Sequence, residues 1–367
     1  MKTAHRFTLL IFCMLTIADF DFAQKPRIEN AKIQELSAAS GLKPAIDSLV
    51  QKETGPLWVG YKIPAAAKDR SMCCLNWNDH RDGDGCCMGC RLESGKENTF
   101  SGTSSNCAPE PVPYAFVFLR VESRQIQKVR VFSADCPLDF AGLPVYWLND
   151  TKPEQSVELL TGMALSATTA RDDESEWHRE PSHQAVMAIA MHDSPSADQA
   201  LEKLIQPGRP LGLRKNVAFW LVLERGKKGL EILEKYVKND SDDDFRAKAT
   251  FAISQSKEPG AVQDLIGMAH SDPSPHVRGQ AIFWLAQIGG RKVAEQITAA
   301  IENDPETEVK KKAVFALSQL HDGSGVPLLI SVARTNKNPV VRKQAIFWLG
   351  QSHDPRALDY LEEILTK

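Results

Sequence analysis

The C-terminal half of the sequence repeats one pattern every 32 residues without an insertion. Each copy has a basic residue, a phenylalanine five residues after it and, in four copies, an acidic or amide residue six residues before it. A fixed period of this length indicates stacked repeats, each too small to bury its own apolar face. The recurring positions are Arg214, Arg246, Arg278, Lys310 and Arg342; Phe219, Phe251, Phe283, Phe315 and Phe347; and Asp240, Asp272, Asp304 and Asn336.

Each unit is predicted to be an antiparallel pair of helices. In HVRGQAIFWLAQIG, the residues Val277, Ala281, Trp284 and Ile288 have the spacing of one helical face, which we expect to face the core. A glycine-rich break follows this helix. The segment RKVAEQITAAIEN then forms a second helix, which ends at the next acidic residue of the pattern and a proline.

This pattern resembles the HEAT repeat, and in particular the short HEAT-like units of phycobilisome lyases. The signature of those units is an Asp, then Val-Arg, then Ala and Leu, and the likeness covers about residues 182–367. The resemblance implies an all-α, armadillo-like superhelical solenoid with a surface that binds other proteins. The matching residues of one unit are Asp272, Val277, Arg278, Ala281 and Leu285.

The residue after each recurring phenylalanine alternates between large and small: Trp220, Ala252, Trp284, Ala316 and Trp348. The true unit is therefore a pair of repeats. We favour tryptophans that fill the core, because large side chains against small ones let stacked layers interdigitate. The alternative is an exposed aromatic row on the concave surface, which would anchor a partner. The partner-binding candidates are accordingly Trp220, Trp284 and Trp348, with the basic run Lys310, Lys311 and Lys312.

The recurring charged residues are expected to be structural. In HEAT-like solenoids, the Asp of one loop bonds the backbone and the Arg of a neighbouring unit, and a charge pair repeated at fixed spacing is expected to be satisfied internally. These structural positions, here called the ladder, are Arg214, Asp240, Arg246, Asp272, Arg278, Asp304 and Arg342.

His-Asp pairs recur at the predicted turns, as His321-Asp322 and His353-Asp354, with a similar pair at His192-Asp193. We interpret each histidine as the end of one helix and each aspartate as the cap of the next, with Pro355 in the first helical turn. No Glu or Cys recurs with them to complete a coordination set, so we expect no metal here.

The N-terminus has the pattern of a secretory signal. A basic start, MKTAHR, precedes the apolar run FTLLIFCMLTIA, and a peptidase could cut after Ala18 or Ala23. The run has 12 residues, fewer than a spanning helix needs, and no later segment is apolar enough to insert stably in a membrane. We therefore expect an exported protein, periplasmic or extracellular. A net charge of −3 gives no electrostatic footprint for nucleic acid.

Seven cysteines remain beyond the predicted signal, all between residues 73 and 136. In an oxidising compartment such clustering indicates disulfides in a small domain, with one thiol unpaired because seven is odd. The alternatives are a metal site at the single C-x-x-C and a redox pair formed by Cys87 and Cys90. The disulfide candidates are Cys73, Cys74, Cys86, Cys87, Cys90, Cys107 and Cys136.

The N-terminal half is predicted to be mostly β. Strands are expected in LWVGYKI from Leu57, in a hairpin of YAFVFLRV and KVRVFS, and in LPVYWL, whereas residues 27–53 are expected to form one or two helices. Ser156 to Thr168 is predicted to be helical. The predicted fold is α+β multidomain: 1–23 a signal peptide, 24–150 a Cys-rich domain, 151–181 a helix and charged linker, and 182–367 the HEAT-like repeats.

These observations predict a secreted or periplasmic scaffold that presents a repeat surface to a protein or peptide partner, with no catalytic residue and no cofactor. The alternative is an enzyme, either a thiol redox protein or a HEAT-type lyase or hydroxylase. In deoxyhypusine hydroxylase the di-iron site resembles paired His-Glu motifs, and this chain contains no His-Glu dipeptide. Bilin lyase activity rests on the shared repeat alone.

Overall fold

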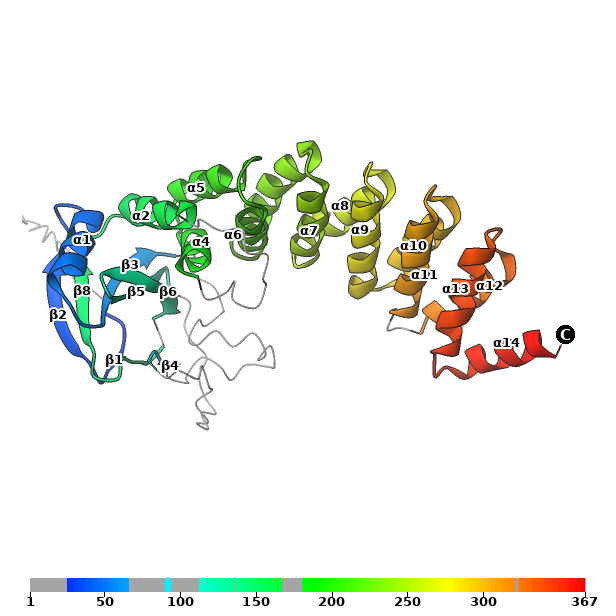
Figure 1. Ribbon diagram of the computed structural model, residues 1–367, viewed down its shortest axis with the longest axis horizontal. Helices are drawn as coiled ribbons and strands as arrows, with labels where there is room; N and C mark the ends of the chain where they lie inside the picture. The colour runs from blue at the N-terminus through cyan, green and yellow to red at the C-terminus, as the bar shows by residue number, and fades with distance from the viewer. Residues whose placement is uncertain are drawn as a thin grey trace, which may run out of the picture.

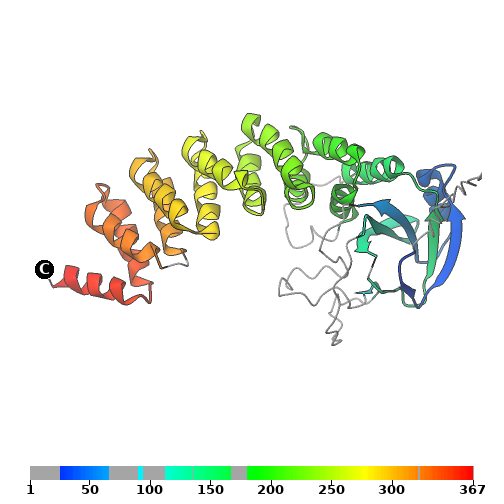
Figure 2. The same cartoon turned by 180° about the vertical axis from the view of Figure 1, so that it is seen from behind.

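The structure is a computed structural model that describes residues 25–65, 90–93, 112–134, 136–166, 180–320 and 323–366. A β-sheet region lies at one end, and a row of helices runs away from it in an arch (Figure 1). Seen from behind, the C-terminal helix lies at the end of the arch farthest from the sheet (Figure 2).

The main sheet has five strands, in which β5 and β6 form an antiparallel hairpin, β3 is antiparallel to β5, and β8 is parallel to both β3 and β2. The hairpin turns at Ser123 and Arg124, whose φ angles of 52° and 59° fit a two-residue turn of type I′. A small sheet has the order β1 (Ile28–Glu29), β7 (Leu138–Asp139) and β4 (Cys90–Arg91). The main order is β2 (Lys32–Ser37), β8 (Pro144–Asn149), β3 (Leu57–Pro64), β5 (Tyr114–Glu122) and β6 (Gln125–Ser133).

Different cores cover the two faces of the main sheet, because alternate residues of a strand point to opposite faces. On one face, aliphatic side chains such as Val117 and Leu119 pack with α1 (Leu42–Lys52) and the first helices of the arch. On the other face the core is aromatic and includes residues of the small sheet. Its large rings are Trp58, Phe116, Phe118, Phe132, Phe140 and Trp147.

The helices of the arch form successive pairs. The long helix α6 bends at Gly226, whose φ of 53° and ψ of −133° are not helical, so its two halves make one pair. The first helix of each pair packs on the first helix of the next pair. The helices are α2 (Pro153–Leu165), α4 (Pro181–Met191), α5 (Pro195–Ile205), α6 (Leu211–Asn239), α7 (Asp243–Ser254), α8 (Gly260–Ser271), α9 (Pro275–Ile288), α10 (Arg291–Asn303), α11 (Thr307–Ser318), α12 (Gly325–Thr335), α13 (Pro339–Gly350) and α14 (Pro355–Leu365).

The sheet and the arch share one hydrophobic core. A single cluster of buried residues runs from Ala38 through the aliphatic face of the sheet to Tyr360 in α14. Helix α4 lies along the edge strand β6, where the side-chain oxygen of Gln184 accepts a hydrogen bond from the Val129 backbone N–H at 2.7 Å. Helix α2 packs against α4 and α5. The described helices from α2 onward are therefore continuous in packing with the sheet. The predicted charged linker lies mostly outside the described residues.

The strand predictions are confirmed as β3, the β5–β6 hairpin and β8, and the helix predicted from Ser156 is α2. The helical prediction for residues 27–53 is correct for α1 and wrong for β1 and β2. The segment Lys32–Ser37 contains good helix formers, but it pairs along its whole length with β8. Long-range pairing of this kind overrides local propensity.

Gly60→Ala is expected to lower the free energy of unfolding by about 1–3 kcal/mol, because it overfills the aromatic core. A Cβ atom at Gly60 would lie 2.4 Å from Cε1 of Phe118, which is itself fully buried. Urea unfolding followed by circular dichroism measures the change. Gly55→Ala is the control, since no atom lies within 4 Å of its added Cβ. Equal stability of the two variants would contradict this packing.

Candidate functional site

Buried ion pairs join consecutive layers of the arch. Arg246 donates from Nε and Nη2 to the two carboxylate oxygens of Asp272, both at 2.9 Å. Arg278 does the same to Asp304, at 2.7 and 3.0 Å, and Arg214 pairs with Asp240. The two arginines of the bidentate pairs also donate from Nη1 to backbone oxygens six residues before them, at 2.8 and 2.9 Å. Each arginine therefore holds its own loop and the loop of the next layer together.

The ladder changes at its fourth step, where the residues are Lys310 and Asn336. Lys310 Nζ donates to the backbone oxygen of Glu302 at 2.8 Å, and Asn336 Oδ1 accepts from the Asn338 N–H at 3.0 Å. Arg342 donates to the backbone oxygen of Asn336 at 2.8 Å. Hydrogen bonds to neutral backbone groups thus replace the ion pair at this step.

The electrostatics of the ladder follow from its hydrogen bonds. The carboxylate of Asp272 raises the pKa of Arg246, and that of Asp304 raises the pKa of Arg278. Arg278 is only 7% exposed. These charged groups lie between the layers, where a partner does not reach them.

Aromatic rings form a continuous row across five layers of the arch. Phe219 and Phe251 stack at 5.9 Å with an interplanar angle of 5°, and Phe283 and Phe315 stack at 6.4 Å and 9°. Trp284 bridges the two stacked pairs, 4.8 Å from Phe251 and 4.9 Å from Phe283. We call this set the aromatic row; its members are Trp220, Phe219, Phe251, Trp284, Phe283, Phe315, Trp348 and Phe347.

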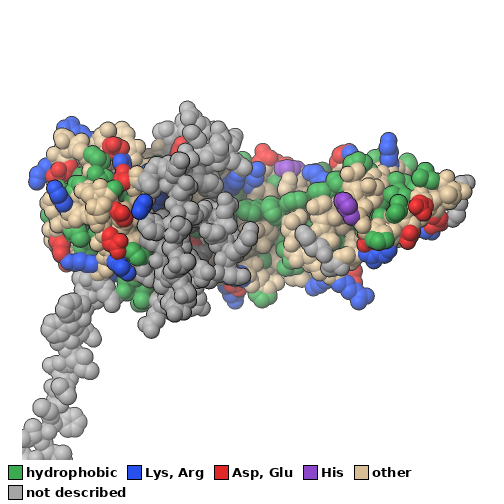
Figure 3. All heavy atoms as spheres, turned by 90° about the horizontal axis from the view of Figure 1, so that it is seen from below, with side chains coloured by type: hydrophobic (Ala, Val, Ile, Leu, Met, Phe, Trp, Pro, Cys, Tyr) green, Lys and Arg blue, Asp and Glu red, His purple; other side chains and the backbone are tan. Residues whose placement is uncertain are grey.

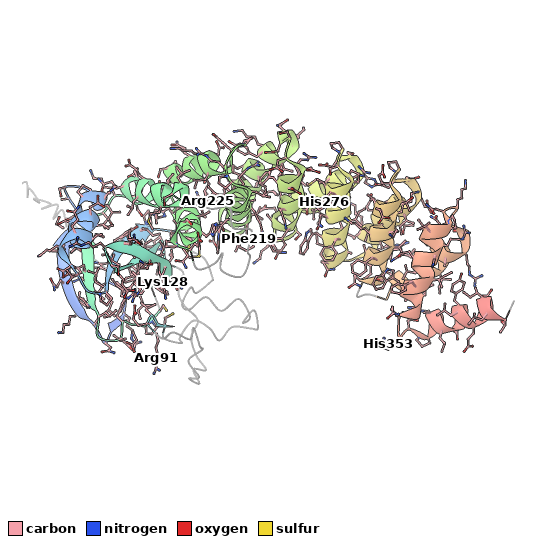
Figure 4. All side chains as sticks on the ribbon, in the orientation of Figure 1. Arg91, Lys128, Phe219, Arg225, His276 and His353 are labelled. Atoms are coloured by element: carbon pink, nitrogen blue, oxygen red, sulfur yellow. The ribbon has the colours of Figure 1, made fainter. Side chains whose placement is uncertain are left out.

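The aromatic row follows the inside of the arch. Figure 3, the view from below, shows a stripe of hydrophobic side chains along the helices, and Figure 4 shows Phe219 on the inner side. Most of the rings are half-buried, Phe347 is 53% exposed, and Trp220 is buried at 7%. The predicted tryptophan positions are therefore brought together with the phenylalanines in one partly accessible surface.

The buried face of α9 differs from the predicted one. Val277 and Ala281 are fully buried as expected, but Ile288 is 41% exposed and Trp284 is half-buried. The buried stripe instead continues to Leu285, which is 1% exposed. The physical reason is that α9 packs against α7, α8 and α11 at once, which widens its buried face and moves its centre.

The surface next to the aromatic row is basic and amide-rich. The positions three and four residues before and after each row phenylalanine lie beside it on the helix. None of these residues is acidic. Five are lysines, namely Lys215, Lys248, Lys311, Lys312 and Lys343, and the position four residues after the phenylalanine is Gln255, Gln287, Gln319 and Gln351 in successive layers. This glutamine series was missed by sequence reasoning, although its 32-residue period was visible.

The predicted basic run of three lysines is divided by the structure. Lys310 takes the place of a ladder arginine in its layer and donates to the backbone oxygen of Glu302, and Lys311 pairs with Glu308 at 3.0 Å. Lys312 is exposed. Its aliphatic side-chain carbons lie against the preceding layer, because a Cβ atom added to Gly279 would be 2.5 Å from Cδ of Lys312. Of the three, only Lys312 is an exposed cation beside the aromatic row.

A buried polar network connects the sheet to the arch. His192 is fully buried, with Nδ1 2.7 Å from the Ala188 backbone oxygen and Nε2 2.9 Å from Ser156 Oγ. Ser156 Oγ is also hydrogen-bonded to Tyr61 Oη at 2.9 Å, and burial raises the pKa of Tyr61. Burial, with a smaller effect of the Arg225 charge, lowers the pKa of His192 to about 4. Because every polar atom of the network is enclosed and bonded, its role is to join the two regions.

Of the other two His-Asp pairs, only His353-Asp354 lies in the part of the chain that the structure describes. Asp354 caps α14 as predicted, accepting from the Arg356 N–H at 2.9 Å, and hydrogen bonds from Arg356 lower its pKa to about 2. His321 and Asp322 lie outside the described residues. Within those residues, no three His, Cys, Asp or Glu side chains gather in a way that could hold a metal ion.

Two of the predicted disulfide cysteines lie in described segments. Cys90 and Cys136 each take part in a disulfide, are 3% and 0% exposed, and belong to the aromatic core beneath the main sheet. The remaining candidates, Cys73, Cys74, Cys86, Cys87 and Cys107, lie outside the described residues. The disulfide framework and the redox pair at Cys87 and Cys90 therefore stay predictions.

A concavity of about 530 Å³ lies between α1, α2, α4 and the β5–β6 turn. Its lining mixes the carboxylates of Asp47 and Glu180 with the guanidinium of Arg124. Asp47 is already paired with Lys43. This mixture selects no single class of ligand.

Among the described helices, none has the length and hydropathy of a membrane-spanning segment.

Three solved structures resemble parts of this chain. Human deoxyhypusine hydroxylase is 18% identical over 57% of this chain and 89% of its own, with a TM-score of 0.25. The CpcE–CpcF complex of phycocyanin lyase from Nostoc sp. PCC7120 is 19% identical over 46% of this chain and 98% of its own, with a TM-score of 0.29. The E. coli protein YibA is 23% identical over 54% of this chain and 71% of its own, with a TM-score of 0.35.

No curated protein matches the sequence. A family model described as HEAT repeats matches residues 230–318 and 294–367. The second helix of α6 and all later helix pairs fall in these matched ranges. The chain therefore carries HEAT repeats over residues 230–367.

Proposed function

We propose that this chain is an exported scaffold that binds a protein or peptide partner along the aromatic row. The observation that carries the proposal is the unbroken contact of rings across five layers on the inside of the arch. A soluble domain buries most of its large aromatic groups, so a partly exposed row of this length marks an interaction surface.

The layer-to-layer ion pairs support this proposal, because they hold the row in a fixed shape. A solenoid whose layers contact only their neighbours is flexible unless each interface is well bonded. Here Arg246 and Arg278 each bind two loops. A surface already ordered before binding loses little conformational entropy when a partner arrives.

The proposal is tested with a displayed library of random peptides. Phe251→Ser with Phe315→Ser removes two rings from the row, and we expect it to weaken the selected peptides by about tenfold or more, a loss of about 1.4 kcal/mol. The matched control is Ile266→Ser with Ile330→Ser, two half-buried residues the same 64 positions apart on α8 and α12. Circular dichroism verifies that both variants fold.

Two results would count against the scaffold. The first is a library that yields no peptide binding to the wild-type chain. The second is an equal loss of binding in the row variant and the α8–α12 control, which would assign the loss to general destabilisation.

Export is the second part of the proposal, and it is supported by the basic and apolar N-terminal segment. Mass spectrometry of the protein made in a bacterial host measures it. We expect the mature chain to begin at Asp19 or Gln24, which follow Ala18 and Ala23. A full-length chain that stays in the cytosolic fraction would refute export.

A further inference from the structure

We propose that the partner of the aromatic row is an acidic polypeptide segment in an extended conformation. This inference rests on the proposed function, since it names the chemistry of the partner that the row would bind. Three features of the inner surface carry it: the orientation of the rings, the charges beside them, and the repeated amides.

Two rings of the row are flanked by other rings on both sides. Phe251 has Phe219 before it, stacked at an interplanar angle of 5°, and Trp284 after it at 4.8 Å. Phe315 likewise has Phe283 before it and Trp348 after it. Each of these two rings therefore has a ring neighbour on both sides along the row. A nucleobase stacks on a ring face that is free of other rings, and these neighbours compete for that place at Phe251 and Phe315.

Ring edges carry partial positive charge, because the quadrupole of an aromatic ring is negative on its faces and positive at its rim. Carbonyl and carboxylate oxygens are the groups that such an edge attracts. The lysines add full positive charge. Lys248, Lys312 and Lys343 are exposed and form no ion pair among the described residues. With no acidic residue at the neighbouring helix positions, this surface favours a partner rich in Asp and Glu.

One of these lysines is placed between two layers. Gly279 has no side chain, and Lys312 of the next layer fills the space beside its Cα. A Cβ atom added at Gly279 would lie 2.5 Å from Cδ and 3.1 Å from Nζ of Lys312. Gly279 lies one helical turn before the row residue Phe283. The ammonium group of Lys312 therefore sits over the preceding layer, beside the row.

The glutamines favour an extended chain. Gln255, Gln287 and Gln351 are exposed, and Gln319 is half-buried. A primary amide can donate to a backbone carbonyl and accept from a backbone N–H, so a series of amides suits a chain whose backbone is not internally bonded. An extended chain advances about 6.6–6.8 Å for every two residues. Within each stacked pair, the centroids of the two phenylalanine rings are 5.9 and 6.4 Å apart, slightly less than this advance.

The test uses three fluorescent probes with the whole chain: a peptide of alternating Glu and Leu, a peptide of alternating Lys and Leu, and an oligothymidylate of about the same length. In fluorescence anisotropy at low salt, we expect the Glu-Leu peptide to bind with a dissociation constant about tenfold or more below those of the other two probes. Lys248→Glu, Lys312→Glu and Lys343→Glu together should abolish that preference. The control reverses the charge of three lysines outside the aromatic row and so changes the net charge by the same amount. It carries Lys227→Glu, Lys235→Glu and Lys292→Glu.

Equal binding of the two peptides, or tighter binding of the oligothymidylate, would overturn the inference. An equal effect of the two triple charge reversals would also overturn it, since it would mean that net charge alone is responsible. The proposed function fails separately. If library peptides bind and require Phe251 and Phe315 but show no acidic preference, the scaffold stands and the acidic partner is rejected.

Discussion

Arg278→Ala is expected to lower the free energy of unfolding by about 3–5 kcal/mol, the largest effect of any single change proposed for the arch. The guanidinium binds both carboxylate oxygens of Asp304 and two backbone oxygens of the preceding loop. The Asp304 side chain is only 4% exposed. Removing Arg278 leaves this carboxylate buried without a counter-charge. Urea unfolding followed by circular dichroism measures the loss.

Lys310→Ala is the matched control, because it changes the next basic position of the same ladder. Lys310 donates one hydrogen bond, to the Glu302 backbone oxygen, and holds no buried carboxylate. We expect a loss within about 0.5 kcal/mol, as for most surface positions. If Arg278→Ala were as mild as this control, the ladder would not hold the layers together, and its arginines would be free to serve recognition.

Acid is expected to destabilise the protein through His192, by about 3 kcal/mol between pH 6.5 and 4. The fold holds the imidazole neutral, with a pKa of about 4 in place of the ordinary 6.5. Between these values the unfolded chain binds a proton that the folded chain does not. The contribution of His192 to the free energy of unfolding is therefore at its full value above pH 6.5. It decreases as the pH falls and is lost below pH 4.

NMR titration of the His192 ring in the folded protein checks the cause directly, and urea unfolding at pH 7 and pH 4.5 checks the effect. His192→Gln should remove this part of the pH dependence, whereas His276→Gln, at a side chain that is 44% exposed, should keep it. A ring that titrates near 6.5 in the folded state would contradict the buried network with Ser156 and Tyr61.

The layered architecture was predictable from the sequence because every layer obeys the same local rules. The ladder could be aligned from its 32-residue period alone, and each Asp that follows an Arg by 26 residues lies in the next loop. Asp354 could be predicted as a cap because an aspartate before a proline satisfies the first turn of a helix. Such features depend on neighbours close in the chain.

Other features depend on contacts that the local pattern does not contain. The strand β2 has the composition of a helix, and only its pairing with β8, more than a hundred residues later, makes it a strand. Trp284 shares a helical face with Val277, but the packing of α9 against α7, α8, α10 and α11 moves the buried face toward Leu285. The link from His192 to Tyr61 likewise joins residues from an α-helix and a β-strand region far apart in sequence.

The candidate surface was predicted in part. The tryptophans were recognised as a possible row, but the phenylalanines were used only as markers of the repeat. Their stacking in pairs, 219 with 251 and 283 with 315, follows from how the layers turn relative to one another, which no helical wheel shows. The glutamine series was present in the sequence at the same period and needed only the fold to place it beside the rings.

Photo-crosslinking tests the central claim most directly. A peptide selected by binding to the whole chain is given a diazirine side chain, irradiated in the complex, and mapped by mass spectrometry. We predict that it attaches along the first helices of the layers, at or beside Phe251, Phe283, Phe315 and Phe347. Attachment to the second helices α8, α10 and α12, or to the β-sheet, would show that binding takes place elsewhere and that the row is packing alone.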